Sequence, residues 1–180
     1  DENGSYAINW PLSSKTISYR WDKNTVDGKT ITKYKYLIGN PIVWFSIVGG
    51  IILSIGLIIG RYVYNNPVKD EKLFYWICAF TGLYVSYMVA ILQIERVMYL
   101  YHYFIPLVFG AINLALIYTY IYREEVIANN KHTIINTALF ATLVIAIFAF
   151  FSPFTYGFGL TEDQFELRNW FSFWKLQVVR

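Results

Sequence analysis

The run PIVWFSIVGGIILSIGLIIG, from Pro41 to Gly60, contains no charged side chain and ends at Arg61. An α-helix rises about 1.5 Å per residue, so this run is long enough to cross a hydrocarbon core about 30 Å thick. Pro41 suits the first helical turn, where its missing N–H removes no hydrogen bond. The sequence therefore predicts a transmembrane helix over residues 41–60.

Three further uncharged runs follow, each bounded by charged residues, at residues 73–94, 97–122 and 133–160. Backbone groups in lipid need internal partners, which helices provide within one segment. We therefore expect an all-α membrane protein with four transmembrane helices within residues 41–160. A polar arm over residues 1–40 precedes them, and an amphipathic tail over residues 161–180 follows.

The composition agrees with a membrane protein. Hydrophobic residues make up 56% of the chain and charged residues only 15%, against about a quarter in soluble domains. The net charge of +3 is small and scattered, which argues against a nucleic-acid partner. The one cysteine, Cys78, lies in an apolar run and is expected to be a small buried hydrophobe.

The arm and the tail have their own patterns. Alternation over residues 30–36 predicts a strand, and Asp27-Gly28 indicates a hairpin turn before it. The tail contains four aromatic residues, Trp170, Phe171, Phe173 and Trp174. Such residues favour the headgroup level, so an interfacial helix is expected, with a tail packed on a partner domain as the alternative.

Orientation does not follow from charge alone. The two tails hold more Lys and Arg than loops 61–72 and 123–132, so the positive-inside rule by itself would place the tails in the cytoplasm. The chain begins at Asp1 without a signal peptide. We interpret it as a piece of a longer protein or a natural C-terminal piece, in which upstream spans would set the side.

The motifs of common soluble enzymes are absent, including nucleotide-binding glycine loops and the HExxH zinc motif. His102 and His132 lie in different regions and form no pair of metal ligands. The sequence therefore predicts no metal site and no catalytic residue within this chain.

One polar cluster lies at the membrane boundary between the second and third spans: Glu95, Arg96, Tyr99, His102 and Tyr103. If a helix continues through this segment, Arg96, Tyr99 and Tyr103 share one face, with Glu95 and His102 beside it. An arginine fork with Tyr and His donors can bind an anionic head group. The alternative is an aromatic belt with a Glu–Arg pair that caps a turn.

A second set lies in the arm: Trp10, Lys15, Tyr19, Arg20 and Trp21. Aromatic and basic side chains suit sugar stacking or contact with a lipid phosphate, so Trp10 and Arg20 are candidate donor or acceptor contacts. The alternative is an arm that rests at the membrane interface.

Three ordered motifs resemble the C-terminal membrane region of the protein O-mannosyltransferase family, and together they cover essentially the whole chain. The first is Trp10-Pro11-Leu12 with Ile17-Ser18-Tyr19 and residues 37–41 followed by Trp44. The second is residues 99–106, which are similar to the family's YHYF.P signature, and the third is residues 164–174.

The resemblance implies an inverting GT-C glycosyltransferase that moves mannose from a polyprenyl-phosphate or dolichyl-phosphate carrier to Ser/Thr of exported proteins. The lipid-linked mannose is a substrate, and no cofactor is implied. The implied partners are membrane lipid, the acceptor protein and the N-terminal half of the same enzyme. That half would carry the acidic catalytic pair, so this chain alone is expected to be inactive.

The resemblance also places the arm and the tail on the extracytoplasmic side of a bacterial plasma membrane or of the endoplasmic reticulum. Arg96, helped by His102 and the neighbouring tyrosines, would then stabilise the departing lipid phosphate. The rival hypotheses are another GT-C glycosyltransferase, a non-catalytic four-span assembly module and a small transporter. A transporter is disfavoured because no predicted span contains a carboxylate.

Overall fold

The structure is a computed structural model that describes residues 4–26 and 29–177. Its α-helices are α1 (Pro41–Tyr62), α2 (Glu71–Leu92), α3 (Phe104–Ile121), α4 (Arg123–Ile127), α5 (Lys131–Tyr156) and α6 (Glu162–Glu166). Its 3-10 turns are η1 (Ala7–Leu12), η2 (Leu100–Tyr103) and η3 (Ser172–Trp174), and its strands are β1 (Ile17–Val26), β2 (Lys29–Leu37) and β3 (Gly159–Leu160).

Four helical segments are long and apolar enough to cross a membrane: Pro41–Tyr62, Glu71–Leu92, Leu100–Ile121 and Lys131–Tyr156. This confirms the four-span architecture. Polar side chains define where three of them begin, because Asn40, Asp70 and Asn130 accept hydrogen bonds from the first N–H groups of α1, α2 and α5.

Helix α3 packs against both α1 and α2, and a polar contact joins all three. The Asn113 amide nitrogen donates to Ser54 Oγ at 2.8 Å, and its oxygen accepts from Thr81 Oγ1 at 3.3 Å. All three side chains are buried. Gly110 lets the helices approach closely, because a Cβ there would meet the side chain of Ile47. Small residues that allow close packing and buried hydrogen bonds commonly stabilise contacts between helices in lipid.

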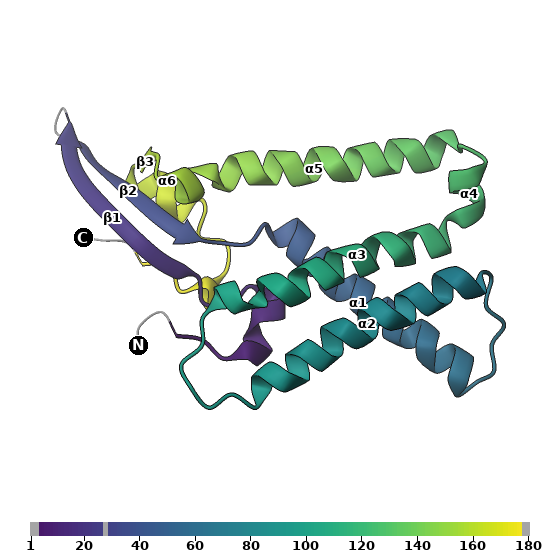
Figure 1. The fold of residues 1–180 in the computed structure, drawn as a ribbon. Coiled ribbons are helices and arrows are strands. Elements are labelled where there is room, and N and C mark those ends of the chain that lie inside the picture. The colour runs from purple at the N-terminus through teal and green to yellow at the C-terminus, as the bar shows by residue number, and fades with distance from the viewer. Residues whose placement is uncertain (1–3, 27–28, 178–180) are drawn as a thin grey trace.

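Helix α5 lies apart from these three helices and is linked to them by the short α4 (Figure 1). Only 6% of its most apolar window is buried within the described structure, against 22–28% for the other spans. One tether reaches its middle: the Asn40 amide donates to the carbonyl of Val144 at 2.9 Å. Apart from this tether, a hydrogen bond between Tyr118 and Thr137 and the packed C-terminal end, most of the surface of α5 is therefore exposed within the described structure.

The end of α5 supports a small antiparallel sheet in the order β1-β2-β3. One face of β2 buries Thr32, Tyr34 and Tyr36, and the tyrosines contact Phe154 and Phe165. Burial raises the pKa of the Tyr36 phenol above its usual value. The aromatic cluster thus anchors the hairpin on the membrane helices.

The tail differs from the single amphipathic helix that its sequence indicates. Within the described residues, a short helix, α6, and a 3-10 turn, η3, are separated by residues 167–171, which form no helix or strand. The Lys15 and Thr16 N–H groups donate to the carbonyls of Phe173 and Trp174 at 2.9 and 3.0 Å, and Trp174 is fully buried. The tail therefore packs on the arm and on α5 of the same chain.

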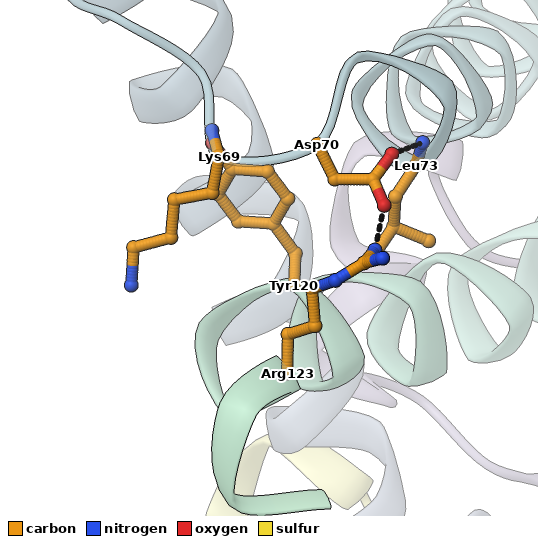
Figure 2. A network of polar contacts seen from close by, with 5 residues as sticks. All are labelled: Lys69, Asp70, Leu73, Tyr120 and Arg123. Carbon is orange, nitrogen blue, oxygen red and sulfur yellow. Dashed lines mark hydrogen bonds and ion pairs between the residues drawn. The ribbon is translucent and has the colours of Figure 1, made fainter. Parts of the chain in front are cut away.

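A polar network closes the opposite end of the bundle (Figure 2). The Asp70 carboxylate accepts from the Leu73 N–H at 2.9 Å and forms an ion pair with Arg123. The Lys69 N–H donates to the Tyr120 hydroxyl at 3.0 Å. These contacts join the α1–α2 loop to the end of α3.

The α2–η2 connection and the arm differ in how far they follow their sequence patterns. Residues 93–99 contain no described helix, because α2 ends at Leu92 and η2 begins at Leu100. The continuous helical face proposed for Arg96, Tyr99 and Tyr103 is therefore wrong. The arm forms the β1–β2 hairpin, while the Asp27-Gly28 turn lies outside the described residues.

Candidate functional site: a cationic cavity at the hairpin end

The segment between α2 and η2 is held by the start of the arm. The Ser5 N–H donates to the carbonyl of Met98 at 2.8 Å. The Trp10 indole N–H donates to Ser5 Oγ at 2.8 Å, and the carbonyl of Trp10 accepts from the Trp44 indole at the same distance. Trp10 thus ties the arm both to the α2–η2 loop and to α1.

An aromatic stack extends this support. The rings of Trp10 and His102 are nearly parallel, with centroids 6.1 Å apart, and the ring of Tyr101 stacks on His102 with a centroid distance of 4.4 Å. His102 Nδ1 lies 3.0 Å from the carbonyl of Tyr99. These contacts fix the position of the imidazole within the aromatic stack that supports the α2–η2 loop.

Between the arm and the loop lies a cavity of about 610 Å³. Its lining residues are Gly4, Ser5, Tyr6, Ala7, Ile8, Lys15, Ile91, Leu92, Ile94, Glu95, Arg96, Val97 and Met98. Two cationic side chains and one carboxylate therefore face a space whose other walls are mostly aliphatic. A cavity of this kind suits an amphiphile with an anionic head and an apolar chain.

The cations in the cavity are available to a ligand. Within residues 4–26 and 29–177, neither Lys15 nor Arg96 makes an ion pair with a carboxylate. Lys15 adopts a positive φ of 59°, and its N–H is held by the carbonyl of Phe173. Left-handed backbone is unfavourable for a lysine, so the tail stabilises the conformation that presents Lys15.

The predicted site residues separate into three groups. Arg96 and Glu95 line the cavity. Tyr99 and His102 stand behind it, in the stack that supports the loop. Tyr103 is fully buried inside the bundle, where its hydroxyl pairs with that of Tyr84 at 2.8 Å, and it does not line the cavity.

The two candidate contacts in the arm are also relocated. Trp10 has an exposed fraction of 0%, so its side chain supports the residues around the cavity but is not accessible to a ligand. Arg20 lies on β1, where it pairs with Asp22 at 3.1 Å, and it does not line the cavity.

Lys15 is the residue whose importance sequence reasoning missed, since it was grouped with the arm and not with Arg96. No local pattern joins these two positions, because they line one cavity only when the arm packs against the α2–η2 loop. No group of three His, Cys, Asp or Glu side chains that could hold a metal occurs in the described part of the chain.

The fold defines a multi-pass membrane protein, and a cavity lined by Lys15, Glu95 and Arg96 lies at one end of its helices. A family model described as the C-terminal four TMM region of protein-O-mannosyltransferase matches residues 1–174. The chain therefore belongs to the protein O-mannosyltransferase family, as its C-terminal four-span region.

Individual relatives agree. The chain is 28% identical to dolichyl-phosphate-mannose–protein mannosyltransferase 1 of Saccharomyces cerevisiae, over 94% of this chain and 21% of that protein. It is 23% identical to polyprenol-phosphate-mannose–protein mannosyltransferase of Mycolicibacterium smegmatis, over 92% of this chain and 31% of that protein. The chain thus spans between a fifth and a third of these relatives.

A solved structure shares the fold. The S. cerevisiae protein O-mannosyltransferase Pmt1-Pmt2 complex bound to the sugar donor matches with a TM-score of 0.76 and 24% identity. The match covers 98% of this chain and 24% of that chain. Arm, sheet, four spans and tail are therefore one shared architecture.

Proposed function

We propose that this chain is the C-terminal membrane part of a glycosyltransferase that transfers mannose from a polyprenyl-phosphate carrier to Ser/Thr hydroxyls of exported proteins. We further propose that it contributes the contact to the donor's phosphate. The observation that carries this proposal is the cavity in which Arg96 and Lys15 lie beside an aliphatic wall. The names of the relatives, which refer to dolichyl- and polyprenol-phosphate mannose, support the donor class.

The chemistry divides between this chain and the rest of the enzyme. An acceptor hydroxyl oxygen attacks the anomeric carbon, and the bond from that carbon to the phosphate oxygen breaks. The electron pair leaves with the lipid phosphate, whose negative charge increases. The hydroxyl proton passes to a carboxylate outside this chain. Arg96 and Lys15 stabilise the growing charge on the phosphate, which lowers the barrier.

The proposal also sets the orientation. The cavity, the hairpin and the tail lie at one end of the spans, opposite the Asp70–Arg123 network. We place this end on the extracytoplasmic side, where exported acceptors are found.

Substitution of Arg96 tests the proposal. In the purified protein, Arg96→Ala should weaken binding of farnesyl phosphate at least about tenfold, equivalent to about 1.4 kcal/mol. In the complete enzyme, the same substitution should slow mannosyl transfer by at least the same factor. Arg96→Lys should retain part of the binding, because it keeps the charge but loses the fork. Farnesol, which lacks the phosphate, should bind equally weakly to all variants.

Lys72→Ala is the matched control, because Lys72 is an exposed cation at the other end of the bundle. It should leave phosphate binding and transfer unchanged. A folded, membrane-inserted Arg96→Ala protein with normal phosphate binding and turnover would exclude the proposed role of this cavity.

A further inference from the structure

Within residues 4–26 and 29–177, the outer edge of β1 has no strand partner. β1 pairs with β2 along its length, and β3 pairs with the far side of β2 at Thr32 and Lys33. No described strand pairs with the outer edge of β1, and residues 19–25 are all exposed. Such an edge carries backbone N–H and C=O groups that can pair with an added strand.

The charge of the hairpin selects among possible strands. Its described side chains include Arg20, Lys23, Lys33 and Lys35, all exposed, against one carboxylate, Asp22. A second copy of the hairpin would bring like charges together, which is unfavourable for cross-strand pairing. The edge therefore favours a neutral or acidic segment over another copy of itself.

Two exposed aromatic side chains lie on the same strand. Tyr19 falls in the irregularity between Ser18 and Arg20, and its exposed fraction is 62%. Trp21 is 50% exposed and lies opposite the buried Tyr34. These rings offer apolar contact to the side chains of an added strand, while the strand edge itself forms hydrogen bonds only with the backbone of that strand.

We propose that the free edge of β1 binds the acceptor polypeptide as an added β-strand, an inference that rests on the proposed transferase function. The hairpin stands at the same end of the helices as η1 and the α2–η2 connection (Figure 1), which line the donor cavity. The exposed part of β1 would hold a segment of roughly 23 Å, at about 3.3 Å per residue. Backbone pairing leaves Ser and Thr hydroxyls on the faces of the added strand, free to react.

Backbone methylation of the peptide tests strand addition without any change to the protein. The probe is an asymmetric, fluorescein-labelled ten-residue peptide of alternating Thr and Val with two Glu, titrated into the protein in zwitterionic nanodiscs. N-methylation of alternate residues should weaken binding about tenfold in one of the two possible frames, since several backbone hydrogen bonds are lost. Methylation in the other frame, which faces away from β1, should change binding little.

Charge reversal supplies an independent measurement. The double variant Lys33→Glu, Lys35→Glu should bind the Glu-containing peptide more weakly and should bind an otherwise identical peptide with two Lys more tightly. Lys72→Glu, at the opposite end of the bundle, should do neither. Absence of peptide binding, or equal loss in both methylation frames, would overturn the proposal. Binding only to anionic nanodiscs would also overturn it, because the partner would then be a lipid surface.

The two proposals fail separately. Arg96→Ala should weaken binding of farnesyl phosphate and leave peptide binding intact. Loss of the frame-dependent peptide effect with normal phosphate binding would remove the acceptor surface and leave the donor site. Normal phosphate binding by Arg96→Ala, with peptide binding as expected, would remove the donor site and leave the edge as a peptide-binding surface.

Discussion

Replacement of Trp10 by Phe distinguishes a supporting role of this residue from direct contact with a ligand. The phenyl ring retains an aromatic surface beside His102 but cannot donate to Ser5 Oγ. A net intramolecular hydrogen bond contributes about 0.5–1.5 kcal/mol. The smaller ring also leaves a void, and voids cost about 24 cal/mol per Å³. We therefore expect a destabilisation of about 1–3 kcal/mol.

Thermal unfolding in detergent, followed by circular dichroism, measures this effect. For a chain of this size, 1 kcal/mol corresponds to a shift in Tm of about 2–4 °C. Ser5→Ala removes the same hydrogen bond from its other partner and should cost about 1 kcal/mol. Because both single variants break one bond, the double variant should be more stable than the sum of the two losses predicts.

Binding of farnesyl phosphate by the same variants decides the role. If Trp10 only supports the cavity, Trp10→Phe should bind the phosphate within about threefold of the unchanged protein, a difference of about 0.7 kcal/mol. A much larger loss of affinity at an unchanged Tm would show that the indole touches the ligand. That result would refute the purely supporting role of Trp10.

Two further predictions concern the helices and their orientation. Asn113→Leu should destabilise the protein by about 1 kcal/mol, because membrane hydrogen bonds contribute about 0.6 kcal/mol each and Asn113 makes two. Thr142→Ala is the control and should leave the Tm unchanged, because the exposed Thr142 hydroxyl donates to a carbonyl of its own helix. In a Cys78→Ala background expressed in a bacterial plasma membrane, a membrane-impermeant maleimide added to intact cells should label Thr25→Cys in the hairpin but not Tyr64→Cys in the α1–α2 loop. The reverse labelling would overturn the proposed topology.

Much of the membrane architecture is readable from local features of the chain. The uncharged run from Pro41 to Gly60 predicts a span because burial in lipid depends on the hydropathy of consecutive residues. Asn40 caps the resulting helix through its own neighbours, Ile42 and Val43. Alternation over residues 30–36 likewise predicts the strand that became β2, because alternate side chains must face opposite sides of a sheet.

The functional end depends on contacts between segments far apart in the chain. Tyr103 turns into the bundle and pairs with Tyr84, while Arg96 stays in an open loop, although both were expected on one helical face. Lys15 and Arg96 line one cavity because Trp10 anchors the arm beside that loop and the tail holds the Lys15 backbone. Hydropathy and caps act within a few turns of one helix, whereas the cavity is created by packing between the arm and the loop. Only the tertiary structure therefore decides that Lys15 and Arg96 line the same cavity.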